Sequence, residues 1–303
     1  HGQALGAPAK IMVYHPDRAL AERLVRSSAT EAARLEDIFS LYRRDSELSR
    51  LNRAGALAAP SAELVDLLKI CLDCWQESGG LFDPTVQPLW VCLKQHFGQP
   101  NANPVGPSRA DWDQALEKIG FDHVRIDNNR IAFTKPHMAL TLNGIAQGFI
   151  TDRITSLLKT AGVEHALVDM GEYRVLGQQP DGRLWQIGIS QMEVGSKIEA
   201  SIAIADQGLA TSSFQGFQFE NSGKFNHLLN PKTGYSASLY QYLTVVSTDA
   251  ARADAWATAF NLMDEQEIRL TLVNQPDMWV FARRRNGEYF TLNAPDASSI
   301  RFL

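Results

Sequence analysis

A strand-to-helix junction lies near the middle of the chain, at Thr141-Leu142-Asn143-Gly144-Ile145-Ala146-Gln147-Gly148-Phe149. An apolar strand pattern leads into it, and Ile154, Leu157 and Leu158 then recur at helical spacing. Glycine lets backbone N–H and C=O groups approach a ligand closely, and a helix start offers unpaired N–H donors that suit a phosphate. The junction is therefore either a phosphate-binding turn or a plain structural turn, and this stretch alone leaves both open.

Upstream of the junction, strand and helix patterns follow one another without a regular alternation. Helices are predicted to open after Asp17 and after the capping residue Ser61. The other predicted elements are a strand at residues 11–14, a loop at 94–107, a short helix capped by Ser108, and a hairpin of 124–126 against 131–133.

Downstream, strand patterns dominate. They cover residues 165–175, 184–190, 197–205 and 242–247. A helix follows from about residue 249 to 263, and Asn286-Gly287 predicts a final hairpin. Because the elements lack a strict βαβ rhythm, we expect an α+β fold with mostly antiparallel sheets and flanking helices. No internal repeat or clear linker interrupts the sequence, so residues 1–303 are predicted to form a single domain.

The composition is that of an ordinary globular protein: 303 residues, 45% hydrophobic and 21% charged. A net charge of −5 gives no broad basic face, which argues against a nucleic-acid partner. No run of about 18 apolar residues predicts a transmembrane segment. Cys71 and Cys74 form a C-x-x-C pair inside a helical pattern, where core packing is a better interpretation than a zinc site.

Asp254-Ala255-Trp256-Ala257-Thr258 places a carboxylate and a hydroxyl at positions i and i+4, hence on one helix face. Hard oxygen donors of this kind suit magnesium, which commonly fills its remaining positions with water and substrate phosphates. The alternative is a solvated aspartate in the first turn of a helix, where it favours the helix dipole.

Two further stretches could carry chemistry. In His227-Leu228-Leu229-Asn230-Pro231-Lys232-Thr233-Gly234, the histidine could move or orient a proton near a reacting phosphate. In Gly79-Gly80-Leu81-Phe82-Asp83-Pro84-Thr85-Val86, a tight turn brings a carboxylate and an aromatic ring together, as a flat ligand would need. Taken alone, residues 227–234 fit a strand that ends in a turn better than a catalytic segment, and residues 79–86 fit a structural turn as well as a ligand site.

Six motifs, taken together and in order, resemble the ApbE-type FAD:protein FMN transferases. They are residues 39–52, 80–86, 142–152, 210–213, 227–234 and 254–258. The resemblance implies an ApbE-like architecture related to the T-fold, and a magnesium-dependent enzyme that transfers FMN from FAD to a Thr or Ser hydroxyl of an acceptor protein, releasing AMP. It would make FAD and Mg²⁺ the cofactors.

Site residues are implied by the same resemblance, position by position. His227 would be catalytic. The FAD-site positions would be Tyr42, Asn52, Leu81, Phe82, Asp83, Thr141, Gln147, Thr211, Ser212 and Leu229. The magnesium ligands would be Gly144 or Ala146, Asp254 and Thr258.

The chain departs from the family pattern near the implied metal site. Thr141 and Asn230 stand where the family commonly has Asp, and Gln147 stands where it has Lys or Glu. Asp169 and Glu172, in a segment that replaces the family's N-x-G-G-D, are candidates to compensate for the missing carboxylates.

The form of residues 142–153 and 168–172 resembles the NosX-type branch of nitrous oxide respiration. That resemblance implies a periplasmic protein whose acceptor is a NosR-like membrane flavoprotein, although the sequence contains no export signal. Three other activities remain open at this stage: an FAD pyrophosphatase, a non-catalytic flavin carrier or maturation factor, and a redox flavoprotein.

Overall fold

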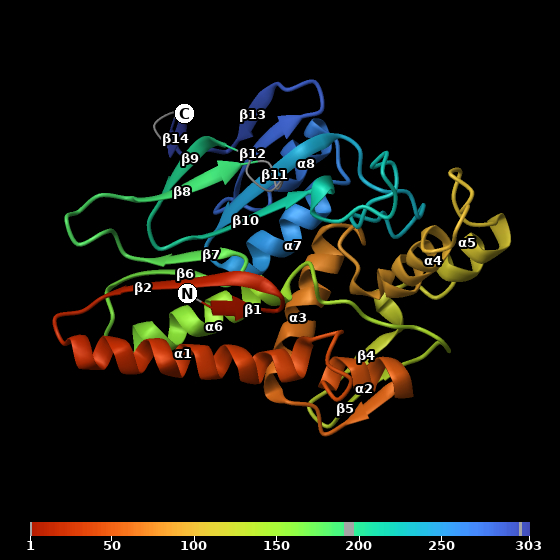
Figure 1. The fold of residues 1–303 in the computed structure, drawn as a ribbon, viewed down its shortest axis with the longest axis horizontal. Helices are drawn as coiled ribbons and strands as arrows, with labels where there is room; N and C mark the ends of the chain where they lie inside the picture. Colours follow the sequence, from red (N-terminus) through yellow and green to blue (C-terminus); the bar gives the residue numbers. More distant parts are fainter. Residues whose placement is uncertain (1, 191–196, 297–298) are drawn as a thin grey trace.

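The centre of the computed structural model is an eight-stranded sheet (Figure 1). The structure describes residues 2–190, 197–296 and 299–303, and every strand pairing within them is antiparallel, as predicted. In spatial order the strands are β1 (Gly2–Ala4), β2 (Ala7–Tyr14), β6 (His165–Asp169), β7 (Tyr173–Leu176), β10 (Gly208–Ser213), β11 (Tyr240–Ser247), β12 (Trp279–Arg284) and β13 (Tyr289–Leu292).

Two three-stranded sheets accompany the large one. The first contains β14 (Ile300–Phe302), β9 (Ile198–Ile204) and β8 (Trp185–Ser190), and the second contains β3 (Ala56–Ala58), β5 (Arg130–Phe133) and β4 (Val124–Ile126). The first packs on one face of the large sheet through a core that includes Trp185, Ile202, Tyr242 and Phe281.

Most of the α-helices begin at a residue whose side chain accepts a backbone N–H of the first turn, as the sequence predicts at Asp17, Ser61 and Ser108. The helices are α1 (Arg18–Phe39), α2 (Glu47–Ala54), α3 (Ala62–Glu77), α4 (Gln87–Phe97), α5 (Arg109–Leu116), α6 (Ala146–Thr160), α7 (Ala250–Phe260) and α8 (Glu265–Leu272), with short 3₁₀ turns at Pro84–Val86, Phe121–His123 and Phe214–Gly216. None of the helices in the described ranges is both long and apolar enough to cross a membrane.

Helices α6 and α7 pack against each other and against the large sheet, on the face opposite the sheet of β14, β9 and β8 (Figure 1). Alternate residues of β11 serve the two faces: Leu243 and Val245 belong to the helical core, whereas Tyr242 and Val246 belong to the core between the sheets. Helix α1 then packs on the outer side of α6. This layering brings residues about a hundred positions apart to one crossing of α6 and α7.

Most of the predicted elements are present, including the hairpin of β4 and β5 and the final hairpin of β12 and β13. The expected strand at residues 165–175 is wrong in one respect: it is two strands, separated by a turn in which Gly171 has φ +107°. Helices α2, α4 and α8 and strands β1, β3, β10 and β14 were not predicted, and residues 94–97 belong to α4 rather than to a loop. Assignment of residues 1–303 to a single domain stays a prediction.

The expected apolar strand before the junction is also wrong. Residues 138–142 form no strand. Their backbone is instead held by two distant groups: Asn52 makes two hydrogen bonds to the N–H and C=O of Leu140 (2.7 and 2.8 Å), and Thr141 N donates to the Pro84 carbonyl (2.8 Å). Since these partners satisfy the backbone, the segment stays ordered without a neighbouring strand.

Candidate active site

One cavity of about 430 Å³ collects most of the candidate residues. Thirteen of the predicted site residues line it: Tyr42, Leu81, Phe82, Asp83, Thr141, Gly144, Gln147, Thr211, Ser212, His227, Leu229, Asp254 and Thr258. These residues come from motifs spread over more than two hundred positions, and the α6–α7 crossing and the end of β10 bring them together.

Asn52 and Ala146 do not line the cavity. The Asn52 side-chain amide donates through Nδ2 to the Leu140 carbonyl and accepts through Oδ1 from the Leu140 N–H, so this residue fixes the segment that leads into the cavity. Ala146 is buried at the start of α6, and its N–H donates to the Leu142 carbonyl (2.8 Å). Their predicted ligand contacts therefore have no support from the lining of the cavity and stay predictions.

The base of the cavity is the contact between the junction before α6 and one face of α7. A methyl group on Gly144 would come within 2.8 Å of Thr258 Oγ1, so glycine is what allows this hydroxyl to lie against the junction backbone. One turn earlier on α7, Asp254 Oδ2 accepts a hydrogen bond from Gly148 N (3.3 Å). The junction near residue 144 thus meets this face of α7 at two points, Gly144 at Thr258 and Gly148 at Asp254.

The start of α6 offers fewer free donors than the sequence predicts. The N–H groups of Ile145 and Ala146 both donate to the Leu142 carbonyl, and that of Gly148 donates to Asp254. Since these first-turn donors already have partners, a simple phosphate cradle at this helix end is not supported. An anion at the junction would therefore bind mainly through a cation held by Asp254 and Thr258.

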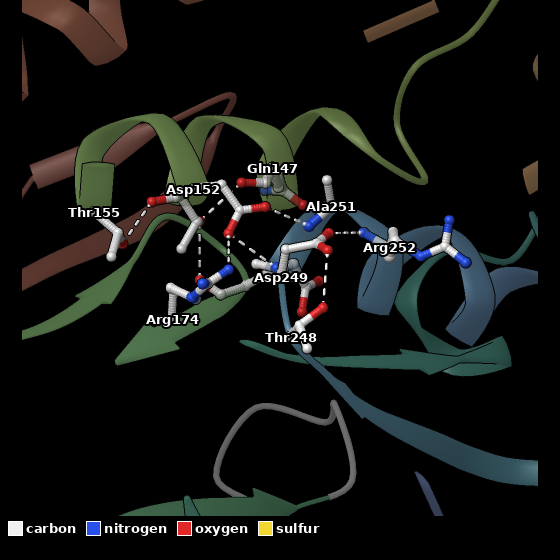
Figure 2. Close-up of polar contacts among 11 residues, drawn as sticks. Gln147, Asp152, Thr155, Arg174, Thr248, Asp249, Ala251 and Arg252 are labelled. Atoms are coloured by element: carbon white, nitrogen blue, oxygen red, sulfur yellow. Dashed lines mark hydrogen bonds and ion pairs between the residues drawn. The ribbon is translucent and has the colours of Figure 1, made fainter. Parts of the chain in front are cut away.

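Asp152 fixes the start of α7 from the neighbouring helix. Its carboxylate accepts hydrogen bonds from Ala250 N (2.9 Å) and Ala251 N (2.8 Å) and pairs with Arg174 of β7 (2.8 Å), as Figure 2 shows. Burial raises the pKa of Asp152 to about 6, while the Arg174 charge opposes that rise. Asp152 ends the motif at residues 142–152 but was absent from the predicted site; it holds the first turn of α7, the helix that carries Asp254 and Thr258.

Glu172 is a second carboxylate of the cavity that the site prediction omitted, although the sequence marked it as a possible replacement. It follows Gly171, whose lack of a side chain leaves room for the Gln147 amide: a methyl group there would lie 2.4 Å from Gln147 Nε2. Thr151 Oγ1 donates to the Glu172 carbonyl (3.0 Å) and Thr211 N donates to Glu172 Oε2 (3.2 Å). Helix α6 and strand β10 thus hold Glu172 at the cavity, near Gln147.

The electrostatics of this region favour a cation. Asp254 is only 4% exposed, and no ion pair to Asp254 or Glu172 occurs within the described residues. Burial raises the pKa of Asp254 to about 7. Burial and the negative charge of Asp254 both raise the pKa of Glu172. Two carboxylates and a hydroxyl are hard oxygen donors, so these residues fit a hard divalent cation that also binds phosphate or water.

In the chain as described, no group of three His, Cys, Asp or Glu side chains converges as a metal site by itself. Cys71 and Cys74 are fully buried within α3, in the core predicted for them, and burial raises the pKa of both thiols. A cation in the cavity would therefore depend on oxygen ligands from its substrate, as magnesium commonly does.

His227 also lines the cavity. Its Nδ1 lies 3.1 Å from the Phe217 carbonyl oxygen, a contact that requires Nδ1 to carry the proton and leaves Nε2 as the acceptor of a neutral ring. Desolvation lowers the pKa of His227, which keeps the ring neutral near pH 7. The histidine is therefore prepared to accept a proton from a group in the cavity.

Aromatic rings form the outer wall. Trp90 and Phe217 contact each other with ring centroids 5.5 Å apart, and Lys94 Nζ lies 4.9 Å from the Trp90 centroid. Tyr42, at 77% exposed, also lines the cavity. Such rings provide apolar faces on which a planar ligand could stack. The sequence prediction missed Trp90 and Phe217 because each lies outside the six motifs.

Asp83 lines the cavity, but its carboxylate has structural partners. It accepts hydrogen bonds from Trp75 Nε1 (3.1 Å), Phe121 N (3.2 Å) and Thr85 N (2.8 Å). Burial raises its pKa, and these hydrogen bonds oppose the rise. Asp83 therefore fixes the turn that carries Leu81 and Phe82, and any contact with a ligand would be secondary to that task.

Comparison with known proteins assigns the chain to a family. A sequence model of the ApbE family matches residues 5–281. The chain belongs to the ApbE family. It is 31% identical over 243 residues to the FAD:protein FMN transferase of Vibrio cholerae, covering 77% of this chain and 71% of that one. It is 28% identical over 264 residues to the FAD:protein FMN transferase of Haemophilus influenzae, an alignment that covers 82% of this chain and 75% of that one.

Solved structures agree with this assignment. The flavin transferase ApbE from Vibrio cholerae superimposes with a TM-score of 0.80 at 26% identity, covering 100% of this chain and 97% of that one. The ApbE protein from Thermotoga maritima gives a TM-score of 0.83 at 25% identity, covering 95% and 94%. The predicted α+β ApbE fold is therefore confirmed.

Proposed function

We propose that this chain is a magnesium-dependent FAD:protein FMN transferase. Its ApbE membership and its relatives, which carry the name FAD:protein FMN transferase, support the transfer activity. The observation that carries the proposal is the junction of Gly144 with Asp254 and Thr258, in a cavity that also holds an aromatic wall and a neutral histidine. Separate features thus suit a diphosphate, a flat ring and a proton transfer.

The residues of the cavity would divide the substrate between them. Asp254, Thr258 and the Gly144 backbone would hold Mg²⁺ and through it the diphosphate of FAD. When bound, the ion would neutralise negative charge on the diphosphate and on the departing AMP. Tyr42, Phe82 and the outer aromatic residues would orient the rings, and the buried base of the cavity would limit access of water to the phosphorus.

The reaction is a phosphoryl-group transfer in which positioning and charge stabilisation do most of the catalysis. The oxygen of an acceptor Thr or Ser hydroxyl attacks the phosphorus on the FMN side. A new P–O bond forms, the bond from that phosphorus to the bridging oxygen breaks, and AMP leaves with the electron pair. We assign the hydroxyl proton to Nε2 of His227, because Nδ1 is held by the Phe217 carbonyl.

We further propose that the chain is of the NosX-like type, acts in the periplasm, and modifies a NosR-like membrane flavoprotein in nitrous oxide reduction. The sequence Val168-Asp169-Met170-Gly171-Glu172 supports this branch, together with the form of residues 142–153. The structure adds that Glu172 of this segment lines the cavity.

Incubation with FAD, Mg²⁺ and the flavin-attachment domain of a NosR-like protein tests the proposal. We expect covalent FMN on the acceptor and one AMP released per flavin attached, both abolished by EDTA. The control is an acceptor whose modified Thr or Ser is replaced by Ala or Val. Release of free FMN and AMP with an unmodified acceptor would instead identify a pyrophosphatase, and intact bound FAD would identify a carrier.

A further inference from the structure

We infer that Arg174 of β7 is a positioning residue for the proposed cation site. Through its ion pair with Asp152 it holds the start of α7. The position of α7 in turn sets how closely Asp254 and Thr258 lie against the junction at Gly144. The inference rests on the proposed function, because it concerns the cation which that function requires. Arg174 lies in none of the six motifs.

The ion pair shares an oxygen atom with the start of the helix. Asp152 Oδ1 accepts hydrogen bonds from Arg174 Nη1 (2.8 Å) and from Ala250 N (2.9 Å). Asp152 Oδ2 accepts one from Ala251 N (2.8 Å). Arg174 therefore fixes the orientation of the carboxylate that receives the first two N–H groups of α7 (Figure 2).

The same turn of α7 is in close contact with two backbones. A methyl group on Gly148 of α6 would lie 2.3 Å from the Ala250 carbonyl oxygen, and one on Gly208 of β10 would lie 2.4 Å from Ala250 N. Gly208 is the residue opposite Arg174 in the pairing of β10 with β7. These contacts oppose movement of the turn toward α6 or β10, and the hydrogen bonds to Asp152 oppose movement away from them.

Helix α7 transmits the position of its first turn to the proposed ligands. Asp254 and Thr258 lie roughly one and two turns beyond Ala250, about 6 and 12 Å along the helix axis. Gly148 N donates to Asp254 (3.3 Å), and a methyl group on Gly144 would lie 2.8 Å from Thr258 Oγ1. Because a helix moves as a rigid element over two turns, a shift of its start displaces both oxygen donors relative to α6.

The charges at the start of α7 explain why a cation is needed there. The N-cap residue Asp249 accepts a hydrogen bond from Arg252 N (2.8 Å). Burial and the negative charge of Asp249 both raise the pKa of Asp152, and the charge of Arg174 opposes that rise. Without Arg174, repulsion between the two carboxylates would favour rotation of Asp152 away from the N–H groups of α7.

The test compares Arg174→Met with Arg283→Met, a matched control on β12. Arg283 forms an ion pair with Glu199 (2.6 Å), and its side chain is 20% exposed, against 21% for Arg174. Neither Arg283 nor Glu199 lines the cavity. Mg²⁺ binding to the FAD-free proteins is measured by calorimetry. We expect Arg174→Met to weaken it about 10-fold and Arg283→Met to leave it unchanged, although both substitutions lower the urea midpoint.

A second readout follows the start of the helix directly. Amide hydrogen exchange of Ala250 and Ala251, measured by NMR, reports on the two hydrogen bonds to Asp152. In Arg174→Met, exchange at both amides should become faster than the loss of global stability accounts for, and in Arg283→Met it should not.

The conservative variant Arg174→Lys keeps the test informative if Arg174→Met folds poorly. Arg174 contacts Asp152 through Nη1, and its Nε has no hydrogen-bond partner within the described residues. A lysine can therefore replace the contact with Asp152, and it should restore most of the Mg²⁺ affinity. A Mg²⁺ affinity in Arg174→Lys as low as in Asp152→Asn would contradict the inference.

A double variant tests whether Arg174 acts through Asp152. Asp152→Asn should weaken Mg²⁺ binding, and Arg174→Met added to it should weaken binding little further, because the carboxylate that Arg174 orients is already absent. Losses of affinity that simply add would overturn the inference.

The outcomes distinguish this inference from the proposed function. If Arg174→Met binds Mg²⁺ with wild-type affinity, the inference is wrong even when FMN transfer is observed. An equal loss of affinity in Arg283→Met would also refute it, since the effect would then follow from global stability. If Mg²⁺ binding depends on Arg174 but only free FMN and AMP are produced, the inference stands and the proposed transfer fails.

Discussion

Gly148→Ala perturbs the crossing on which the cavity depends. An added Cβ would lie 2.3 Å from the Ala250 carbonyl oxygen, 2.6 Å from its carbon and 2.8 Å from Ala251 Cα. Optimal separations between non-bonded heavy atoms are about 3.5–4.0 Å, and all three neighbours are backbone atoms that no side-chain rotation can move. Helices α6 and α7 must therefore separate by about 1 Å.

The magnitude follows from two opposing effects. Overpacking of this kind costs about 3 kcal/mol, and replacement of glycine by alanine within a helix returns about 1 kcal/mol. We expect the free energy of unfolding to fall by about 2 kcal/mol. Because the same separation moves Gly144 away from Thr258 and Gly148 away from Asp254, Mg²⁺ binding should weaken as well.

Urea unfolding and Mg²⁺ calorimetry measure the two effects on the same samples. Ser156→Ala is the control, since Ser156 is exposed on α6 and its replacement adds no atoms. The close crossing of α6 and α7 would be refuted if the free energy of unfolding of Gly148→Ala lay within about 0.5 kcal/mol of the wild-type value and its Mg²⁺ affinity were unchanged.

Three other results are expected. Asn52→Ala removes both hydrogen bonds to Leu140. In urea unfolding, this substitution should lower the free energy of unfolding by about 1–3 kcal/mol, and in the transfer assay it should raise the KM for FAD. Unchanged stability and KM would contradict its positioning role. Burial lowers the pKa of His227 below 6.5, so its neutral, proton-accepting form persists down to that pH and transfer activity should decline only at lower pH. This is measured as the pH dependence of kcat. A loss of activity centred above pH 6.5, or the same pH profile in His227→Gln, would argue against His227 as the proton acceptor. A thiol reagent at pH 8 should modify Cys92 first, because Cys71 and Cys74 are buried and their pKa values are raised; mass spectrometry showing early modification of Cys71 or Cys74 would contradict this.

Much of the site could be predicted because its residues lie in short motifs whose order along the chain is itself informative. The sequence also indicated the caps at Asp17, Ser61 and Ser108 and the final hairpin, since these depend on neighbouring residues. The sequence could not indicate which backbone Asn52 serves, because its partner Leu140 is 88 positions away. An apolar run such as residues 138–142 reads as a strand when such distant partners are unknown.

The sequence analysis missed several site residues for the same physical reason: their partners are distant in sequence. Asp152 acts through the first turn of α7, 98 and 99 positions away, and its importance becomes visible only where α6 and α7 cross. Glu172 was noted as a possible replacement, but its position follows from the turn at Gly171 and the packing of Gln147 there. Trp90 belongs to α4, a helix that the loop prediction partly concealed.

A crystal structure with FAD and Mn²⁺ tests the central claim most directly, since the anomalous signal of manganese marks the position of the ion. The account predicts one anomalous peak bound by Asp254 and Thr258 beside Gly144, at roughly 2–2.5 Å from their oxygens, with the FAD diphosphate on its open side. A diphosphate bound elsewhere in the cavity, or a manganese peak away from Asp254, would contradict it.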